Sequence, residues 1–151
     1  MAKSKERLRT TPFGLWRYGN DFRLAATYVL DHERSKYFMP YYFLLGQSIE
    51  LSMKAFLLGR GVAITELRAK NLGHDLVALL GECKRRKIGK EVELSQYHGA
   101  GIRILNLTYK PRRLQYIETG LMSLPEAWMV HEAAENLSVG LESFCHKATT
   151  W

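Results

Sequence analysis

The chain of 151 residues has a length typical of one domain, and a chain of this size buries about 70% of the surface that its unfolded form exposes. Hydrophobic residues make up 46% and charged residues 25% of the sequence, a balance that matches a folded globular protein and excludes a disordered or collagen-like chain. The formal net charge is +7 at pH 7.

The sequence contains no segment with the properties of a membrane span. Crossing a bilayer takes about 20 predominantly apolar residues, and the most apolar stretch, residues 39–58, is interrupted by polar and charged side chains. The basic start is followed by neither an apolar stretch nor a small-residue cleavage site, so it does not resemble a secretory signal. We expect a cytoplasmic protein in which residues 1–12 form a flexible basic arm and residues 13–151 form a single domain.

Helical periodicity begins early in the chain. Apolar residues recur at steps of three and four over residues 18–34, which predicts a first amphipathic helix. Pro40 suits the first turn of a second helix that ends near Leu58, and its two neighbouring apolar stripes predict a central position in the bundle. Residues 65–70 predict only a short turn or half-helix.

Three more helices are predicted in the second half of the chain. Asp75 suits the positive start of the third, and residues 92–109 predict a fourth that Pro111 ends. Ser123 and Glu126 predict a capping box at the start of the last helix. Because no segment alternates with period two, the sequence predicts an all-α fold, an antiparallel bundle of about five helices.

Potential metal ligands are scattered along the chain. Cys83 and Cys145 lie far apart, each on the apolar side of a helical pattern, and we expect both to be small buried hydrophobic residues. The five histidines form no H-x-x-x-H pair, and the cysteines form no C-x-x-C pair. We expect neither a structural metal nor a cofactor.

Basic residues gather in three clusters, which lie at residues 3–9, 84–90 and 103–113. The third cluster consists of Arg103, Lys110, Arg112 and Arg113. If the second and third clusters share one face, they form a positive surface suited to phosphates, whereas a solvated face is the alternative for either alone. Residues 84–87 also complement the negative end of the third helix dipole, which is a purely local explanation.

Two short motifs stand out near the middle of the chain. The first is a predicted helix with a Glu and a Lys-Ala element, Glu50 and Lys54 within residues 47–58, and the second is the His-Asp-Leu that opens the next helix at His74 and Asp75. Together they resemble the HEPN family of helical bundles (higher eukaryotes and prokaryotes nucleotide-binding). Similar proteins then carry a Tyr, an Arg and another aromatic residue. Those positions are matched here by Asn106, Tyr109, Arg113 and Tyr116.

The resemblance covers roughly residues 41–144 and implies a homodimeric helical bundle. It also implies binding of nucleotide or RNA, or partnership with a nucleotidyltransferase in a toxin–antitoxin or defence system. The residues allow a simpler role as well. Glu50 and Lys54 have the favourable order for a helical ion pair worth about 0.2–0.5 kcal/mol. Two roles are open to this pair: a structural role, in which it orients His74 or Arg113, and the binding of a ligand.

Three functional hypotheses follow from these patterns. The favoured one is a non-catalytic module that binds nucleotide or RNA phosphates through Arg103, Lys110, Arg112 and Arg113. The second is a metal-independent ribonuclease, since HEPN ribonucleases carry an Arg, four to six residues and a His, a spacing that only Arg68 and His74 have here. The third is a structural protein-interaction module whose positive charge aids solubility.

In the ribonuclease hypothesis a ribose 2′-OH attacks the adjacent phosphate while His74 moves protons and Arg68 stabilises phosphate charge. Two features count against it. Ala69 stands where the family usually has a polar residue, and the pair precedes the third helix whereas the family motif belongs near a later one.

Overall fold

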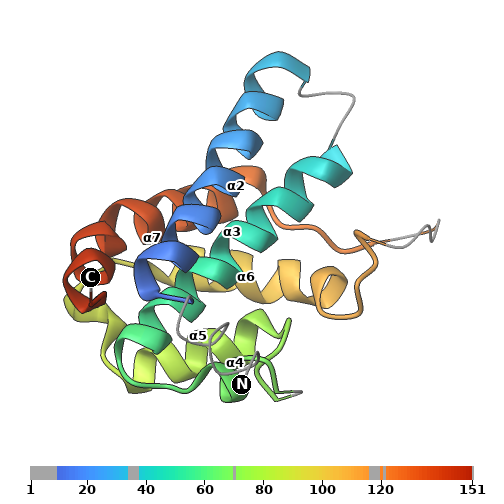
Figure 1. Ribbon diagram of the computed structural model, residues 1–151. Helices are drawn as coiled ribbons and strands as arrows, with labels where there is room; N and C mark the ends of the chain where they lie inside the picture. Colours follow the sequence, from blue (N-terminus) through green and yellow to red (C-terminus); the bar gives the residue numbers. More distant parts are fainter. Residues whose placement is uncertain (1–9, 34–37, 70, 116–119, 121, 151) are drawn as a thin grey trace.

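The computed structural model describes residues 10–33, 38–69, 71–115, 120 and 122–150 of the chain. These residues form six α-helices and one short 3₁₀-helix, with no strand among them, which confirms the all-α helical bundle (Figure 1). The elements are α2 (Pro12–Glu33), α3 (Phe38–Gly59), α4 (Ile64–Leu67), α5 (Leu76–Arg85), η1 (Ile88–Lys90), α6 (Gln96–Tyr109) and α7 (Ala127–Ala148). The single turn of α4 corresponds to the predicted half-helix.

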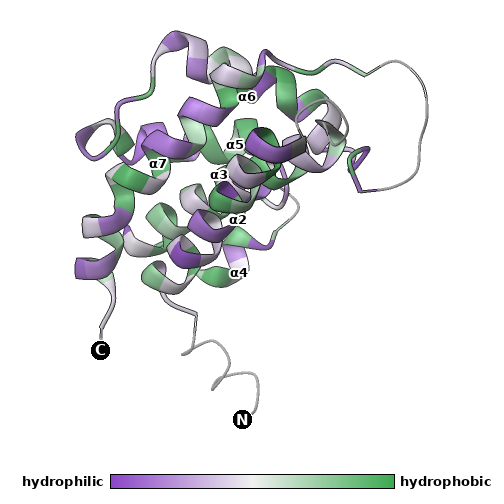
Figure 2. Cartoon of the chain, turned by 90° about the horizontal axis from the view of Figure 1, so that it is seen from above, coloured by the Kyte–Doolittle hydropathy of each residue, from purple (hydrophilic) through white to green (hydrophobic). Residues whose placement is uncertain are grey.

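Helix α3 occupies the centre of the bundle, as its two apolar stripes predict. It packs against α2, α7, α5 and α6, and it runs beside α2 in the opposite direction (Figure 1). Leu45, Ile49, Met53 and Phe56 on α3 have no exposed surface. Hydrophobic and hydrophilic residues alternate along the bundle's helices, as amphipathic helices around a common core require (Figure 2).

Helix α2 begins at Pro12, earlier than the start near residue 18 that periodicity predicts. Thr11 caps this turn, because its Oγ1 accepts a hydrogen bond from the Gly14 backbone at 3.0 Å, and proline is favoured at the first helical position. The added turns pack on α7, where Trp16 Nε1 donates to the Ser138 carbonyl at 2.7 Å. The predicted basic arm falls largely on residues 1–9, which lie outside the described residues.

The capping box predicted at Ser123 and Glu126 is wrong. Helix α7 starts at Ala127 without a side-chain cap, because the preceding residues are non-helical and two of their carbonyls accept hydrogen bonds from other helices. Thr108 Oγ1 donates to the Ser123 carbonyl at 2.8 Å, and Tyr42 OH donates to the Pro125 carbonyl at 2.6 Å. Tertiary hydrogen bonds therefore replace the local capping bonds.

Helix α6 also starts later than predicted, at Gln96 instead of residue 92. A true capping box forms there, since Ser95 Oγ accepts from the His98 backbone and the Ser95 backbone donates to the His98 ring. The helix ends at Tyr109, two residues before Pro111, as predicted.

Both cysteines are buried free thiols, as the apolar pattern predicts, and burial raises the pKa of Cys145 to about 12.

No helix in the described part of the chain is both long and apolar enough to cross a membrane. Among the same residues no three His, Cys, Asp or Glu side chains are grouped so that they could hold a metal ion.

Candidate functional site

An open pocket of about 490 Å³ lies where the second half of α3, the start of α5 and the end of α6 meet. Its volume falls in the range of small-ligand sites, about 300–1,000 Å³. The lining residues are Lys54, Arg68, Gly73, His74, Asp75, Lys110 and Arg112. Four of these seven residues are Lys or Arg, one is a histidine and one is an acidic residue, so the net positive charge of the pocket suits an anion.

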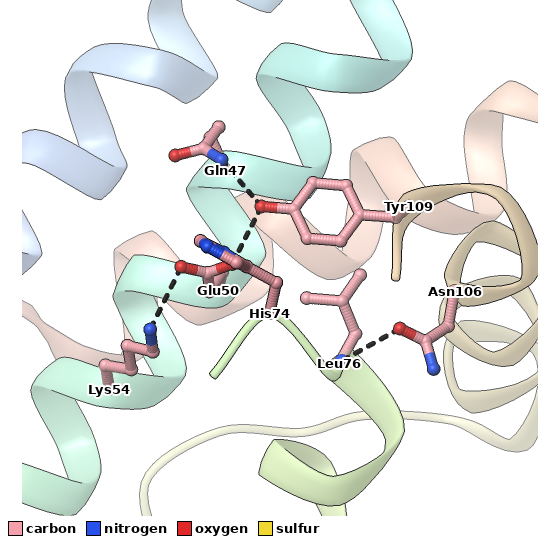
Figure 3. A network of polar contacts seen from close by, with 7 residues as sticks. All are labelled: Gln47, Glu50, Lys54, His74, Leu76, Asn106 and Tyr109. Carbon is pink, nitrogen blue, oxygen red and sulfur yellow. Dashed lines mark hydrogen bonds and ion pairs between the residues drawn. The ribbon is translucent and has the colours of Figure 1, made fainter. Parts of the chain in front are cut away.

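Behind this pocket, the buried carboxylate of Glu50 is bonded to side chains from three segments of the chain (Figure 3). Glu50 on α3 has a side chain that is 4% exposed, and its Oε2 lies 3.1 Å from the Lys54 ammonium one turn later. Its Oε1 lies 2.7 Å from His74 Nδ1 and accepts a second hydrogen bond from the Tyr109 hydroxyl at 2.9 Å. One carboxylate thus links α3, the start of α5 and the end of α6.

Tyr109 is the member of this network that comes from α6. Its hydroxyl accepts a hydrogen bond from Gln47 Nε2 at 2.7 Å while it donates to Glu50. Burial, together with the charge and hydrogen bond of Glu50, raises the pKa of Tyr109 far above its ordinary value. The ring lies against Gly46, where a Cβ would come within 2.4 Å of two ring carbons, so only glycine leaves room for it.

A second set of hydrogen bonds joins α5 to α6 at the pocket edge. Asn106 Oδ1 accepts from the Leu76 backbone at 2.9 Å, and Asn106 Nδ2 donates to Asp75 Oδ1 at 3.0 Å. Asp75 caps α5 by accepting from the backbones of Val77 and Ala78. Its other oxygen lies 3.0 Å from Lys110 Nζ.

Burial alone would raise the pKa of Asp75, but other contacts outweigh it and lower the pKa. These contacts are the hydrogen bonds from the Ala78 backbone and from the Lys110 and Asn106 side chains, together with the Lys110 charge. Asp75 is therefore ionised at neutral pH and compensates one cation of the pocket.

His74 combines a fixed ring with access to the pocket. A carboxylate can only accept hydrogen bonds, so the contact with Glu50 places a proton on Nδ1. The other ring nitrogen, Nε2, has no hydrogen-bond partner among the described residues, and the side chain is 39% exposed. In the neutral ring Nε2 is therefore an acceptor, and in the protonated ring it is a donor.

The structure brings together some of the predicted site residues and leaves others apart. Eight of the predicted residues come together at one pocket. Its lining includes Lys54, Arg68, His74, Asp75, Lys110 and Arg112, and Glu50 and Tyr109 lie directly behind it. Two predicted phosphate-binding residues do not line the pocket. Arg103 is exposed on α6. The Arg113 backbone donates to the Thr108 carbonyl at 3.1 Å, and the Arg113 side chain is not part of the lining.

The second basic cluster contributes no side chain to the lining of this pocket. Arg85 and Arg86 instead form ion pairs with Glu82 on their own helix, which agrees with the local explanation for that cluster. Lys54 and Arg68 supply the positive charge that was expected from the second basic cluster, although neither residue lies in a cluster of charges in the sequence. Their positions in the family-like motif and in the Arg-His spacing were the only available signals.

Comparisons with known proteins add nothing to this geometry, since no protein-family model, curated protein or solved structure matches the chain. The function of the pocket must therefore be argued from its own chemistry.

Proposed function

We propose that this protein is a HEPN-like module that binds a phosphate group of a nucleotide or RNA in the pocket at the meeting point of α3, α5 and α6. The observation that carries the proposal is the lining itself, which gathers four Lys and Arg side chains and one His. The four cations come from three separate segments of the chain, so only the folded protein forms this positive surface: Lys54 lies on α3, Arg68 follows α4, and Lys110 and Arg112 follow α6.

The residue types suit phosphate. The guanidinium of arginine presents several N–H donors in a fixed fork that matches phosphate oxygens, and charge-assisted hydrogen bonds of this kind are among the strongest in proteins. Lys54 and Lys110 are held in place by Glu50 and Asp75 at 3.1 and 3.0 Å, so their ammonium groups are already oriented at the pocket wall. Such preorganisation lowers the cost of ordering side chains upon binding.

Binding of a fluorescein-labelled single-stranded RNA, followed by fluorescence anisotropy at several salt concentrations, tests the proposal. We expect affinity to fall as salt rises, because cations that contact phosphates release counterions on binding, and Arg68→Ala or Arg112→Ala to weaken binding about tenfold. Arg103→Ala is the matched control, an exposed arginine on α6 outside the pocket, and should change affinity little. Binding that is independent of salt, or equal losses in all three variants, would contradict the proposal.

A second candidate function is metal-independent RNA cleavage, and the position of Arg68 and His74 in one pocket favours it. With Nδ1 engaged by Glu50, neutral His74 offers the lone pair of Nε2 to the proton of a ribose 2′-OH. As the 2′-oxygen bonds to the phosphorus, the P–O5′ bond breaks, and the 5′-oxygen leaves with the proton that His74 has taken up; the products are a 2′,3′-cyclic phosphate and a 5′-hydroxyl end. Arg68 would stabilise the charge that develops on the phosphate. A histidine fixed by a carboxylate on its other nitrogen is a common arrangement for a general base.

Incubation of the protein with total RNA in EDTA separates the two candidates. If the pocket is catalytic, we expect the RNA to be cut, and His74→Ala to slow cutting by a factor of about 10²–10⁴, because a positioned general base contributes that much to the rate. The circular dichroism spectrum of His74→Ala must match that of the unmodified chain. Absence of cleavage with the unmodified protein leaves phosphate binding as the function and rules out the ribonuclease.

The resemblance also implies a homodimer or a nucleotidyltransferase partner, and we place this contact on α2. Tyr18, Leu24 and Tyr28 are 65%, 50% and 63% exposed on one side of that helix. Exposed aromatic and aliphatic residues of this kind are typical of protein interfaces.

A further inference from the structure

The charges around the pocket are only partly compensated. Lys54 pairs with Glu50 and Lys110 pairs with Asp75, so two of the four cationic side chains have a carboxylate within 3.1 Å. Arg68 and Arg112 are both exposed, and neither forms an ion pair with an acidic residue in the described part of the chain. Two guanidinium charges therefore remain for a ligand.

A ligand that neutralises two guanidinium groups carries two negative charges. A phosphate monoester has a charge of about −1.5 to −2 at pH 7, because its second pKa is near 6, and it offers three acceptor oxygens. A phosphate within an RNA strand is a diester, which carries one charge. Paired guanidinium forks suit the three oxygens of a monoester better than the two free oxygens of a diester.

His74 also favours a phosphate monoester over a diester. When its ring is neutral, the Nδ1 proton is engaged by Glu50 and Nε2 can only accept a proton. A monoester in its singly charged form has a P–OH proton to donate to Nε2, and in its doubly charged form it accepts from a protonated ring. A diester has no such proton, so it pairs with His74 only when the ring is protonated.

We propose that the pocket recognises a terminal phosphomonoester, as on the end of an RNA strand or on a mononucleotide. This inference rests on the proposed function and narrows its ligand class. The pocket is open to solvent, so the rest of a nucleotide or strand can extend out of it while the terminal phosphate contacts Arg68, Arg112 and His74. Lys54 and Lys110 then flank the site as already paired cations.

Three hexauridylates with a 5′-phosphate, a 3′-phosphate or no terminal phosphate separate this inference from the proposed function. By isothermal titration at pH 7.5 and low salt, we expect at least one phosphorylated oligomer to bind about tenfold more tightly than the unphosphorylated one. The combined Arg68→Ala and Arg112→Ala variant should lose this preference, so that all three oligomers bind it with the same reduced affinity. Arg103→Ala should keep the full preference and serves as the control for a lost surface charge.

The outcomes are distinguishable. Equal, salt-dependent binding of all three oligomers overturns the monoester inference and leaves the proposed function standing. No salt-dependent binding of any oligomer overturns both. Because both pocket arginines have exposed side chains, circular dichroism should show an unchanged helical fold in the variant.

Discussion

Replacing Glu50 with alanine is expected to lower the free energy of unfolding by about 3–5 kcal/mol, as is typical when one member of a buried charged network is removed. Lys54, His74 and the Tyr109 hydroxyl would all lose their acceptor at once. The Lys54 side chain is only 13% exposed, so water cannot fully replace the lost carboxylate. Urea denaturation followed by circular dichroism measures the change.

Two further variants make the Glu50 result interpretable. Glu50→Gln keeps the size of the side chain and one acceptor oxygen, so we expect a smaller loss, about 1–3 kcal/mol. Glu66→Ala removes an exposed carboxylate on α4 and should change stability by less than about 0.5 kcal/mol. A loss of less than about 1 kcal/mol for Glu50→Ala would show that the network does not stabilise the fold.

Gly46→Ala is expected to destabilise the protein by about 1–3 kcal/mol, the usual cost of inserting a methyl group into a packed core. The added Cβ would lie 2.4 Å from Cδ2 and Cε2 of Tyr109, closer than van der Waals contact permits. The ring would have to move, and its hydroxyl would move with it away from Glu50 and Gln47. The same substitution should therefore disturb the pocket as well as the core.

Gly81→Ala is the matched control, since Gly81 lies inside helix α5 and an added Cβ would have no other atom within 4 Å. There the change should stabilise the helix by about 0.5–1 kcal/mol, because alanine is the better helix former. Combining Gly46→Ala with Tyr109→Leu should cost less than the sum of the two single changes, because the clash is relieved. If Gly46→Ala behaves like Gly81→Ala in thermal denaturation, the close packing of Tyr109 is contradicted.

Much of the helical architecture could be predicted from the sequence, because periodicity and helix-stop residues are local signals. The central position of α3 followed from the width of its apolar surface, and the end of α6 followed from Pro111. The start of α7 could not be predicted in this way. Ser123 and Glu126 have the spacing of a capping box, but hydrogen bonds from distant helices hold that segment in a non-helical form.

The candidate site was predictable only in fragments. Glu50, Lys54, His74 and Tyr109 could be singled out by their resemblance to family motifs, yet nothing in the sequence indicates that the Tyr109 hydroxyl donates to Glu50 from another helix. The phosphate surface was expected from clusters of basic residues along the chain. The pocket instead combines two cations of the third cluster, Lys110 and Arg112, with Lys54 and Arg68 from other segments, a combination that depends on tertiary packing.

The contact between α2 and α7 joins residues that are far apart in the chain. The indole of Trp16 donates to the carbonyl of Ser138, 122 positions later, and the Phe13 backbone donates to Thr149 Oγ1, 136 positions later. At a synthesis rate of about 5–20 residues per second, the ribosome needs on the order of ten seconds to add the segment between Trp16 and its partner. Of the two described helices that pack extensively on α2, only α3 is present during that interval, so the contact between α2 and α7 forms after residues 127–148 have been made.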